Sequence, residues 1–250
     1  MSDLPLKDRI ALVVGASRGI GYESALALAN AGAHVVATAR TQGGLEELDD
    51  AIFAATGKHA TLVPFDLVDG GAIDRLGGAI FERFGKLDIW VQAAATMGPS
   101  GLTPVSHAEP RVFAKVEKTN FTGVYRLIRS LEPLLRVSDA GRAIYLTTSV
   151  AAAPKAFWGM YAATKAGAEA LFKCWADEIE STPIRATILD PGRMRTAMRA
   201  QAYPGEDPQE VVHPSAIGPL IVELARGDVR PPLTVSFKDW QAGPSTSALI

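Results

Sequence analysis

Short apolar, β-branched runs alternate along the chain with longer stretches in which apolar residues recur at helical spacing. Several of the short runs are apolar nearly throughout, which is typical of parallel strands covered on both faces. They predict strands at 9–14, 34–39, 61–65, 87–92, 142–148, 184–189 and 233–237. The stretches between them predict helices at 20–31, 43–56, 72–84, 110–136, 160–181 and 214–226.

This alternation predicts an α/β protein: a single-domain Rossmann fold over 1–250, with a doubly wound parallel sheet of about seven strands and helices on both faces. Ligands bind such sheets at the carboxyl ends of the strands. The Gly- and Pro-rich connection 191–213 is longer than most loops, and we expect 193–213 to be a mobile substrate loop. The last residues, 241–250, are expected to form a loose C-terminal tail.

Composition and charge narrow the class of protein. The 250 residues are 48% hydrophobic and 21% charged, enough for a sizeable core. A net charge of −2 gives no electrostatic basis for binding nucleic acid or an anionic membrane. One cysteine, Cys174, excludes an internal disulfide, and no metal-ligand spacing is present. Without a signal-peptide layout or an apolar run long enough to span a bilayer, we expect a soluble, cytoplasmic protein.

A glycine-rich turn, GASRGIG, directly follows the first predicted strand and leads into a helix. Glycine lets the backbone turn tightly and approach a pyrophosphate, and the helix N-terminus offers free N–H groups. Because strand, turn and helix fall where this motif needs them, the segment predicts a dinucleotide site rather than a turn that binds nothing. The candidate contacts are Gly15, Ser17, Arg18, Gly19, Ile20 and Gly21.

Two arginines indicate which dinucleotide is bound. An NAD site typically places an acid on the ribose 2′-hydroxyl, after the second strand. Arg40 occupies that place here and Arg18 lies inside the glycine turn. Each alone could be a solvated side chain, but together they suit a 2′-phosphate and predict NADP(H) over NAD(H). Asp66, followed by Leu67, could accept a hydrogen bond from the adenine amino group, or could instead cap the next helix.

The segment YAATK places Tyr161 four positions before Lys165. On a helix these residues share one face. A free phenol has a pKa of about 10, too high for acid–base work at neutral pH, and a nearby ammonium lowers it. An isolated pair of this kind is usually a surface Tyr on a Lys stem. Ser149, just past the end of a predicted strand, favours a site instead, because ligands are expected there.

With these segments the chain resembles the short-chain dehydrogenase/reductase family over nearly all of its length. The resemblance rests on GASRGIG, on TNFTG with Asn120, on TTSVA with Ser149, on YAATK, and on DPGRMRTAM at 190–198. It implies an oxidoreductase that transfers hydride between NADP(H) and a carbonyl or secondary alcohol. The segment RTAMRAQAYPGEDP further resembles a bacterial branch of the family, without indicating the substrate.

The resemblance also implies residue roles. Tyr161 would donate a proton in reduction and accept one in oxidation, while Lys165 would lower its pKa and hold the nicotinamide ribose. Ser149 would hydrogen-bond the substrate carbonyl, and Asn120 would anchor a water that links Lys165 to solvent. The residues expected at the nicotinamide end of the cofactor are Pro191, Gly192 and Thr196.

Three segments depart from the family pattern. Val14 stands where Thr is usual, and VQAAA (91–95) replaces the usual NNAG after the fourth strand. Ala93 supplies only backbone groups and Ala95 restricts a turn that glycine leaves free, so we expect weaker cofactor binding or a shifted loop. Near the C-terminus, KDWQAGP replaces a glycine-ended strand, and residues around Trp240 are expected to reach a partner subunit.

An apolar substrate pocket with a mobile lid at 193–210 is expected beside this site. The rim residues would be Met97, Phe157, Trp158, Met194, Met198 and Tyr203, with ordinary packing as the alternative for Met97 and Phe157. Three arginines in the lid are expected to be solvated or paired with acids, with contact to an acidic or phosphorylated substrate as the alternative: Arg193, Arg195 and Arg199.

Two other functions stay open. The Tyr–Lys pair also serves dehydratases and epimerases on the same scaffold. A nucleotide-binding regulator without turnover is opposed by Asn120, Ser149, Tyr161 and Lys165, and weakly favoured by the altered QAAA segment. The resemblance further implies a homodimer or homotetramer, built through the helices at 110–136 and 160–181.

Overall fold

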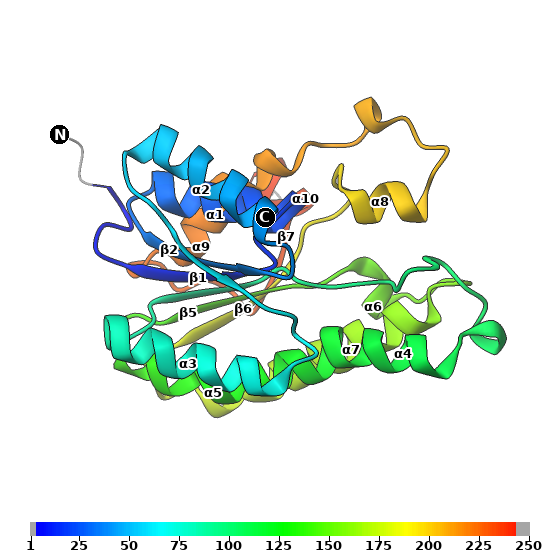
Figure 1. The fold of residues 1–250 in the computed structure, drawn as a ribbon, viewed down its shortest axis with the longest axis horizontal. Coiled ribbons are helices and arrows are strands. Elements are labelled where there is room, and N and C mark those ends of the chain that lie inside the picture. The colour runs from blue at the N-terminus through cyan, green and yellow to red at the C-terminus, as the bar shows by residue number, and fades with distance from the viewer. Residues whose placement is uncertain (1–3, 244–250) are drawn as a thin grey trace, which may run out of the picture.

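The computed structural model describes residues 4–243, which form one parallel sheet of seven strands with helices on both faces (Figure 1). The strands are β1 (Ile10–Val14), β2 (His34–Ala39), β3 (Thr61–Pro64), β4 (Ile89–Gln92), β5 (Arg142–Leu146), β6 (Arg185–Asp190) and β7 (Thr234–Ser236). Their order is β3-β2-β1-β4-β5-β6-β7, and the order reverses between β1 and β4. The seven predicted strands and the doubly wound fold are confirmed, and a ligand crevice is expected at this reversal.

Two helical layers cover the sheet (Figure 1). One contains α1 (Gly19–Asn30), α2 (Gln42–Thr56) and α9 (Gly218–Ala225), and the other contains α3 (Gly70–Phe84), α5 (Gly123–Val137) and α7 (Gly159–Glu178). Successive strand side chains point to opposite faces. In β1, Ala11 and Val13 therefore join the core under α1, while Leu12 and Val14 join the core under α7. Because both faces of the central strands β1 and β4 are covered, these strands are almost entirely apolar.

The predicted helix at 110–136 is interrupted. It consists of α4 (Pro110–Glu117), a π-helical turn, η2 (Lys118–Thr122), and then α5. The π turn carries Asn120, whose Oδ1 accepts from Thr96 N at 2.8 Å and whose Nδ2 donates to Thr96 O at 2.8 Å. Single π turns inside helices are frequent at functional sites. Here the turn directs one side chain toward the loop after β4.

Three short helices were not predicted from the sequence, because four to six residues are too few to show a helical period. They are α6 (Ser149–Ala152), α8 (Ala197–Ala202) and α10 (Phe237–Ala242). α8 projects beyond the sheet at the end where α4 and α6 also lie (Figure 1). Within 193–213, a bridge pairs Met194 with Val212.

The C-terminal region differs in part from the expectation of a loose tail. Gln241 and Ala242 complete α10, while residues 244–250 lie outside the described residues. Trp240 stacks on Phe237 with ring centroids 5.9 Å apart, and its indole N–H donates to Glu223 of α9 at 2.9 Å. Within this chain, Trp240 therefore packs on α9.

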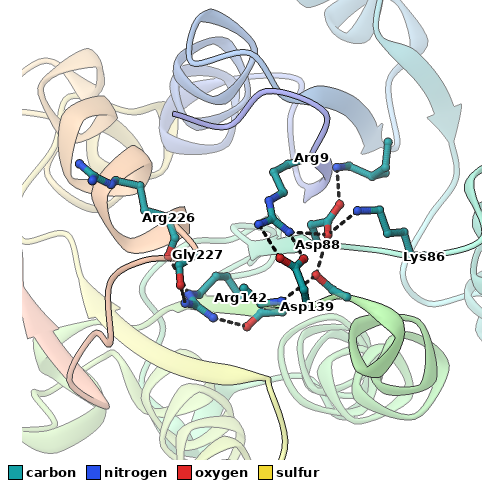
Figure 2. A network of polar contacts seen from close by, with 11 residues as sticks. Arg9, Lys86, Asp88, Asp139, Arg142, Arg226 and Gly227 are labelled. Atoms are coloured by element: carbon teal, nitrogen blue, oxygen red, sulfur yellow. Dashed lines mark hydrogen bonds and ion pairs between the residues drawn. The ribbon is translucent and has the colours of Figure 1, made fainter. Parts of the chain in front are cut away.

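A charged network closes the amino ends of the central strands (Figure 2). Asp88, just before β4, is fully buried and accepts from Ile10 N at 2.8 Å, Lys86 Nζ at 3.0 Å and Ser138 Oγ at 2.6 Å. Arg9 contacts the same carboxylate and also pairs with Asp139. Burial alone would raise the pKa of Asp88, but these donors hold it below its usual value. The carboxylate can therefore stay charged inside the fold.

Arg142, the first residue of β5, also lies at the amino ends of the strands (Figure 2). Its buried guanidinium donates to the main-chain oxygens of Arg226 at 3.0 Å, Gly227 at 2.7 Å and Val229 at 2.9 Å. These bonds fasten the loop before β7 to the middle of the sheet. The network lies at the amino ends of the strands, opposite their carboxyl ends, and its role is structural.

Candidate active site

A cavity of about 560 Å³ lies along the carboxyl ends of the first five strands. It connects the glycine turn after β1 with Tyr161 and Lys165 on α7. The predicted residues that line it are Gly15, Ser17, Arg18, Gly19, Ile20, Gly21, Arg40, Asp66, Leu67, Tyr161, Lys165 and Thr196. Four others are not among its lining residues: Asn120, Ser149, Pro191 and Gly192.

The glycine turn is pressed against the loop after β4. Gly15 has φ +92°, and a Cβ there would lie 2.6 Å from the main-chain nitrogen of Ala94. A Cβ on Gly21 would lie 2.1 Å from Gly15 O, so neither position tolerates a side chain. α1 begins at Gly19 with no side chain capping its N-terminus and no acid in its first turn. Its free N–H groups and its dipole therefore fit an anionic pyrophosphate.

Arg18 and Arg40 line the same part of the cavity, and both are exposed. Within residues 4–243 neither forms a salt bridge. Thr41, next to Arg40, lines the cavity as well. Two guanidinium groups without carboxylate partners fit a dianionic phosphate group better than a ribose hydroxyl.

Asp66 follows β3 and lines the cavity beside Leu67. Its Oδ1 accepts from Val68 N at 3.2 Å within a turn. The N-cap of α3 is Asp69, whose Oδ1 accepts from Ala72 N at 3.0 Å. The alternative role of Asp66 as the cap of this helix is therefore wrong, and its carboxylate belongs to the cavity wall.

Tyr161 and Lys165 are both buried, with 8% and 3% of their surfaces exposed. Lys165 Nζ donates to Leu146 O at 2.5 Å and lies 4.1 Å from the ring centroid of Tyr145. Burial lowers the pKa of Lys165 to about 7, while the charge of Glu169 works in the opposite direction. The ammonium is thus close to losing its proton at neutral pH.

The pKa of Tyr161 does not move in the expected direction. Burial raises it, and the charge of Asp190 raises it further. The direction is therefore opposite to the lowering expected from Lys165, because removing the phenolate from water is costly. At neutral pH the phenol carries its proton, which is the form that a proton donor needs.

The hydroxyl groups after β5 are arranged differently from the expectation. Ser149 is exposed at the start of α6. Thr147 lines the cavity instead, and its Oγ1 donates to Glu169 Oε2 at 2.6 Å. Sequence reasoning missed Thr147 and the half-buried Thr148, although YLTTS holds three hydroxyl residues in a row. Position after a strand alone does not say which of the three turns inward.

Asn120 lies behind the cavity wall rather than in it. Besides its two bonds to Thr96, its Nδ2 donates to Thr164 Oγ1 at 3.1 Å. Thr164 lies on α7, one residue before Lys165. Asn120 therefore joins the loop after β4 to the helix that carries the Tyr–Lys pair, and it holds both in place.

The QAAA segment is less disturbed than expected. All three of its alanines line the cavity, and Ala93 N donates to Val14 O at 2.9 Å. Among residues 4–243 the non-glycine positions with positive φ are Asp8 and Phe157, so Ala95 adopts an ordinary conformation. The turn at Ala95 therefore does not need the conformational freedom of glycine. Gln92 Nε2 also donates to Ala94 O at 3.1 Å, which holds the loop.

Tyr161 belongs to an apolar cluster whose other members are Ala95, Met97, Leu102, Val150, Trp158, Ala162, Met198 and Ala202. Trp158 lies between two tyrosines, with ring centroids 5.8 Å from Tyr161 and 6.1 Å from Tyr203. Two predicted rim residues lie elsewhere. Met194 belongs to the core around α1 and α9, and Phe157 is 55% exposed.

Gln201 and Thr196 connect the 193–213 segment to the rest of the cavity. Gln201 Nε2 donates to Gly98 O at 3.1 Å and to Pro99 O at 3.2 Å. The methyl group of Thr196 would lie 3.2 Å from a Cβ at Gly19. α8 thus spans the cavity from the glycine turn to the loop after β4. Arg199 Nη2 lies 2.5 Å from Glu206 Oε1 and Arg193 is exposed, in agreement with the expectation for these two arginines. Arg195 differs, because its Nε is buried without a hydrogen-bond partner among the described residues.

The described part of the chain contains neither a candidate metal site nor a candidate membrane-spanning helix. No group of three or more His, Cys, Asp or Glu side chains could hold a metal ion. No helix between residues 4 and 243 is long and apolar enough to cross a membrane.

Comparisons with known proteins agree with this geometry. Residues 9–207 match the model of the short chain dehydrogenase family. The chain is 35% identical over 240 residues to the uncharacterized oxidoreductase YciK of Escherichia coli, covering 95% of this chain and 94% of that protein. It is also 30% identical over 207 residues to a 2,3-dihydro-2,3-dihydroxybenzoate dehydrogenase of Bacillus subtilis, covering 83% and 78% of the two chains.

Solved structures extend the likeness to three dimensions. A short chain dehydrogenase of Shigella flexneri complexed with NADP superposes with a TM-score of 0.89 at 35% identity, covering 94% of this chain and 99% of that one. One from Escherichia coli complexed with NADPH gives 0.88 at 35% identity, covering 94% and 98%. The chain belongs to the short-chain dehydrogenase/reductase family. Its fold and cavity are those of an oxidoreductase that uses a nicotinamide cofactor.

Proposed function

We propose that this protein transfers hydride between NADP(H) and a carbonyl or secondary alcohol that carries apolar substituents. One observation carries the proposal: one cavity joins the glycine turn and two arginines that form no salt bridge within residues 4–243 to the buried Tyr161 and Lys165. Membership of the family and the NADP- and NADPH-bound relatives support it. The apolar side chains around Tyr161 support the substrate class.

Each part of the cavity has a role in this proposal. The glycine turn and the N-terminus of α1 hold the pyrophosphate, Arg18 and Arg40 hold the 2′-phosphate, and Asp66 binds the adenine amino group. Lys165 would hold the nicotinamide ribose, and Pro191, Gly192 and Thr196 would hold the nicotinamide end. When bound, the cofactor supplies the hydride in reduction or accepts it in oxidation.

Tyr161 moves the proton. In reduction it donates from its phenol to the substrate oxygen, and in oxidation its base form accepts from the alcohol. The apolar surroundings of the ring exclude water, so a hydrogen bond to the developing oxyanion counts for more than it would in water. We propose Ser149 as the second hydroxyl on that oxygen, and Asn120 as the anchor of a water leading from Lys165 to solvent.

Cofactor preference is testable at Arg40. Replacing Arg40 with Asp should weaken NADPH binding about tenfold or more and shift preference toward NADH, because a carboxylate repels the 2′-phosphate and accepts from a ribose hydroxyl. Titration of both cofactors by fluorescence measures this. Arg230→Asp, at an exposed position outside the cavity lining, is the matched control. Equal affinity of the wild-type protein for NADH and NADPH would contradict the assignment.

We further propose that the protein is a homodimer or homotetramer. The outer face of α7 carries small residues that permit close helix packing, among them Ala163, Ala166, Gly167 and Ala170. Light scattering at micromolar concentration should give at least twice the mass of the 26.5 kDa chain. Ala163→Glu, which places a charge on this exposed face, should shift the protein toward monomer. A monomeric wild type would refute the proposal.

Two other functions remain distinguishable by experiment. A dehydratase or epimerase would act on its substrate without net change in the cofactor, and a regulator would bind NADP(H) without any turnover. A panel of apolar aldehydes, ketones and secondary alcohols, followed by NADPH absorbance, separates all three. Stoichiometric cofactor oxidation or reduction supports the proposed function, and its absence with every substrate class counts against it.

A further inference from the structure

The helix face that carries Tyr161 and Lys165 continues with two more charged residues. Glu169 and Lys173 follow at the same interval of four, so phenol, ammonium, carboxylate and ammonium succeed one another along α7. Lys165 is buried, the Glu169 side chain is 16% exposed, and that of Lys173 is 48% exposed. The row therefore leads from the cavity to the protein surface.

Two consecutive residues at the end of β5 hold the middle of this row. Leu146 O accepts from Lys165 Nζ at 2.5 Å, and Thr147 Oγ1 donates to Glu169 Oε2 at 2.6 Å. The other carboxylate oxygen of Glu169 accepts from Lys173 Nζ at 2.7 Å. Both oxygens are thus engaged, and the carboxylate is kept one helical turn from Lys165 instead of swinging into solvent.

Lys165 has few other neighbours that favour a charge. From β5 it meets a main-chain oxygen and the ring of Tyr145, and Asn120 and Thr164 nearby are uncharged. On its own helix the other titratable neighbour is Tyr161, on which Asp190 at the end of β6 acts. A buried ammonium without an ion pair is costly. Burial lowers the pKa of Lys165, and the charge of Glu169 opposes that change.

We propose that Glu169 is a positioning residue that keeps Lys165 charged, and thereby sets the upper pH limit of cofactor binding. The inference rests on the proposed contact between Lys165 and the cofactor ribose. A charged ammonium donates stronger hydrogen bonds than a neutral amine and attracts the anionic cofactor. Thr147 contributes by holding the carboxylate in place, whereas Lys173 competes with Lys165 for its charge.

Glu169→Gln tests this, because the amide keeps the shape and an acceptor for Thr147 but removes the charge. The NADPH dissociation constant is measured by fluorescence between about pH 6 and pH 9. Affinity of the wild type should fall as pH rises and Lys165 loses its proton. In the variant that fall should begin about one pH unit lower, since an opposite charge nearby moves a pKa by about 1–3 units. The difference between the two proteins should narrow toward about pH 6, where Lys165 is mostly protonated in the wild type and about half protonated in the variant.

A second variant should shift the pH at which affinity falls in the opposite direction. Lys173→Met removes the cation that shares the carboxylate, so Glu169 acts on Lys165 undiminished and the fall should move to higher pH. Glu169→Asp retains the charge and should stay nearer to the wild type than Glu169→Gln. The control is Glu178→Gln, an exposed carboxylate at the end of the same helix, for which no shift is expected.

A purely structural role for Glu169 predicts a different pattern: weaker binding by the same factor at every pH, with the midpoint unmoved. That result, or unchanged midpoints in both Glu169→Gln and Lys173→Met, would overturn the proposal. The readout is cofactor binding rather than turnover. A wild type that binds NADPH but reduces nothing would therefore contradict the proposed function and leave this inference standing.

Discussion

Replacing Tyr161 with Phe should lower turnover by about 10²–10⁴, the usual contribution of a positioned acid–base group. The change removes one oxygen from a ring that packs against Met97, Trp158 and Met198, so the fold and the affinity for NADPH should stay close to those of the wild type. Initial rates on a confirmed substrate, together with NADPH titration, measure the two quantities separately. A loss confined to turnover assigns the phenol to the chemical step.

The pH dependence of oxidation gives a second readout of the same phenol. Burial raises the pKa of Tyr161, so its base form is scarce at neutral pH and grows as the solution becomes alkaline. Oxidation by the wild type should therefore accelerate with rising pH, and this limb should vanish in Tyr161→Phe. Tyr125→Phe, at an exposed tyrosine on α5, is the control and should behave as wild type. A Tyr161→Phe variant as active as the wild type would remove the phenol from the mechanism.

Replacing Lys165 with Met should reduce turnover and NADPH affinity together. The ammonium is buried beside Leu146 O and the Tyr145 ring, and Met fills similar volume without a charge or a donor. Loss of a hydrogen bond from a charged group costs about 1.5–3 kcal/mol, which corresponds to roughly 10- to 100-fold in affinity. Turnover should fall further than affinity, because proton transfer by Tyr161 loses its charged neighbour as well.

The Lys165 prediction is tested by measuring both NADPH affinity and turnover in Lys165→Met. Lys115→Met, at an exposed position on α4, controls for the loss of a positive charge from the protein surface. A regulator without turnover would lose NADPH binding in Lys165→Met but would show no rate to lose in Tyr161→Phe. If Lys165→Met bound NADPH as tightly as the wild type, the proposed ribose contact would be wrong, and Glu169 would have nothing to act on.

Much of this fold is readable from local patterns, with particular exceptions. All seven strands follow from apolar runs, yet the helix expected at 110–136 is split by the π turn at Asn120. Periodicity cannot reveal that turn, because it depends on bonds to Thr96, which lies on a distant loop. The short α6, α8 and α10 are similarly held by their surroundings and are too brief to show a period.

The candidate site was likewise predicted only in part from the sequence. Spacing alone placed Tyr161 beside Lys165 and predicted the glycine turn. Of the six predicted rim residues, however, only Met97 and Met198 line the cavity, and Phe157, Trp158, Met194 and Tyr203 do not. Among three successive hydroxyl residues it chose Ser149, whose role stays a prediction, and it missed Thr147, which lines the cavity. Which of several neighbouring side chains turns inward depends on the packing of segments far away in the sequence.

The sequence by itself determined the class of fold, the dinucleotide turn, and the shared helical face of Tyr161 and Lys165. These follow from short-range geometry: strand and helix periods, the steric freedom of glycine, and the four-residue repeat of a helix. Only the tertiary structure decided how deeply the pair is buried, and therefore that the pKa of the phenol is raised rather than lowered. Desolvation reflects every segment packed around a group, and the chain brings β5, α7 and the loop after β4 together there only once it has folded.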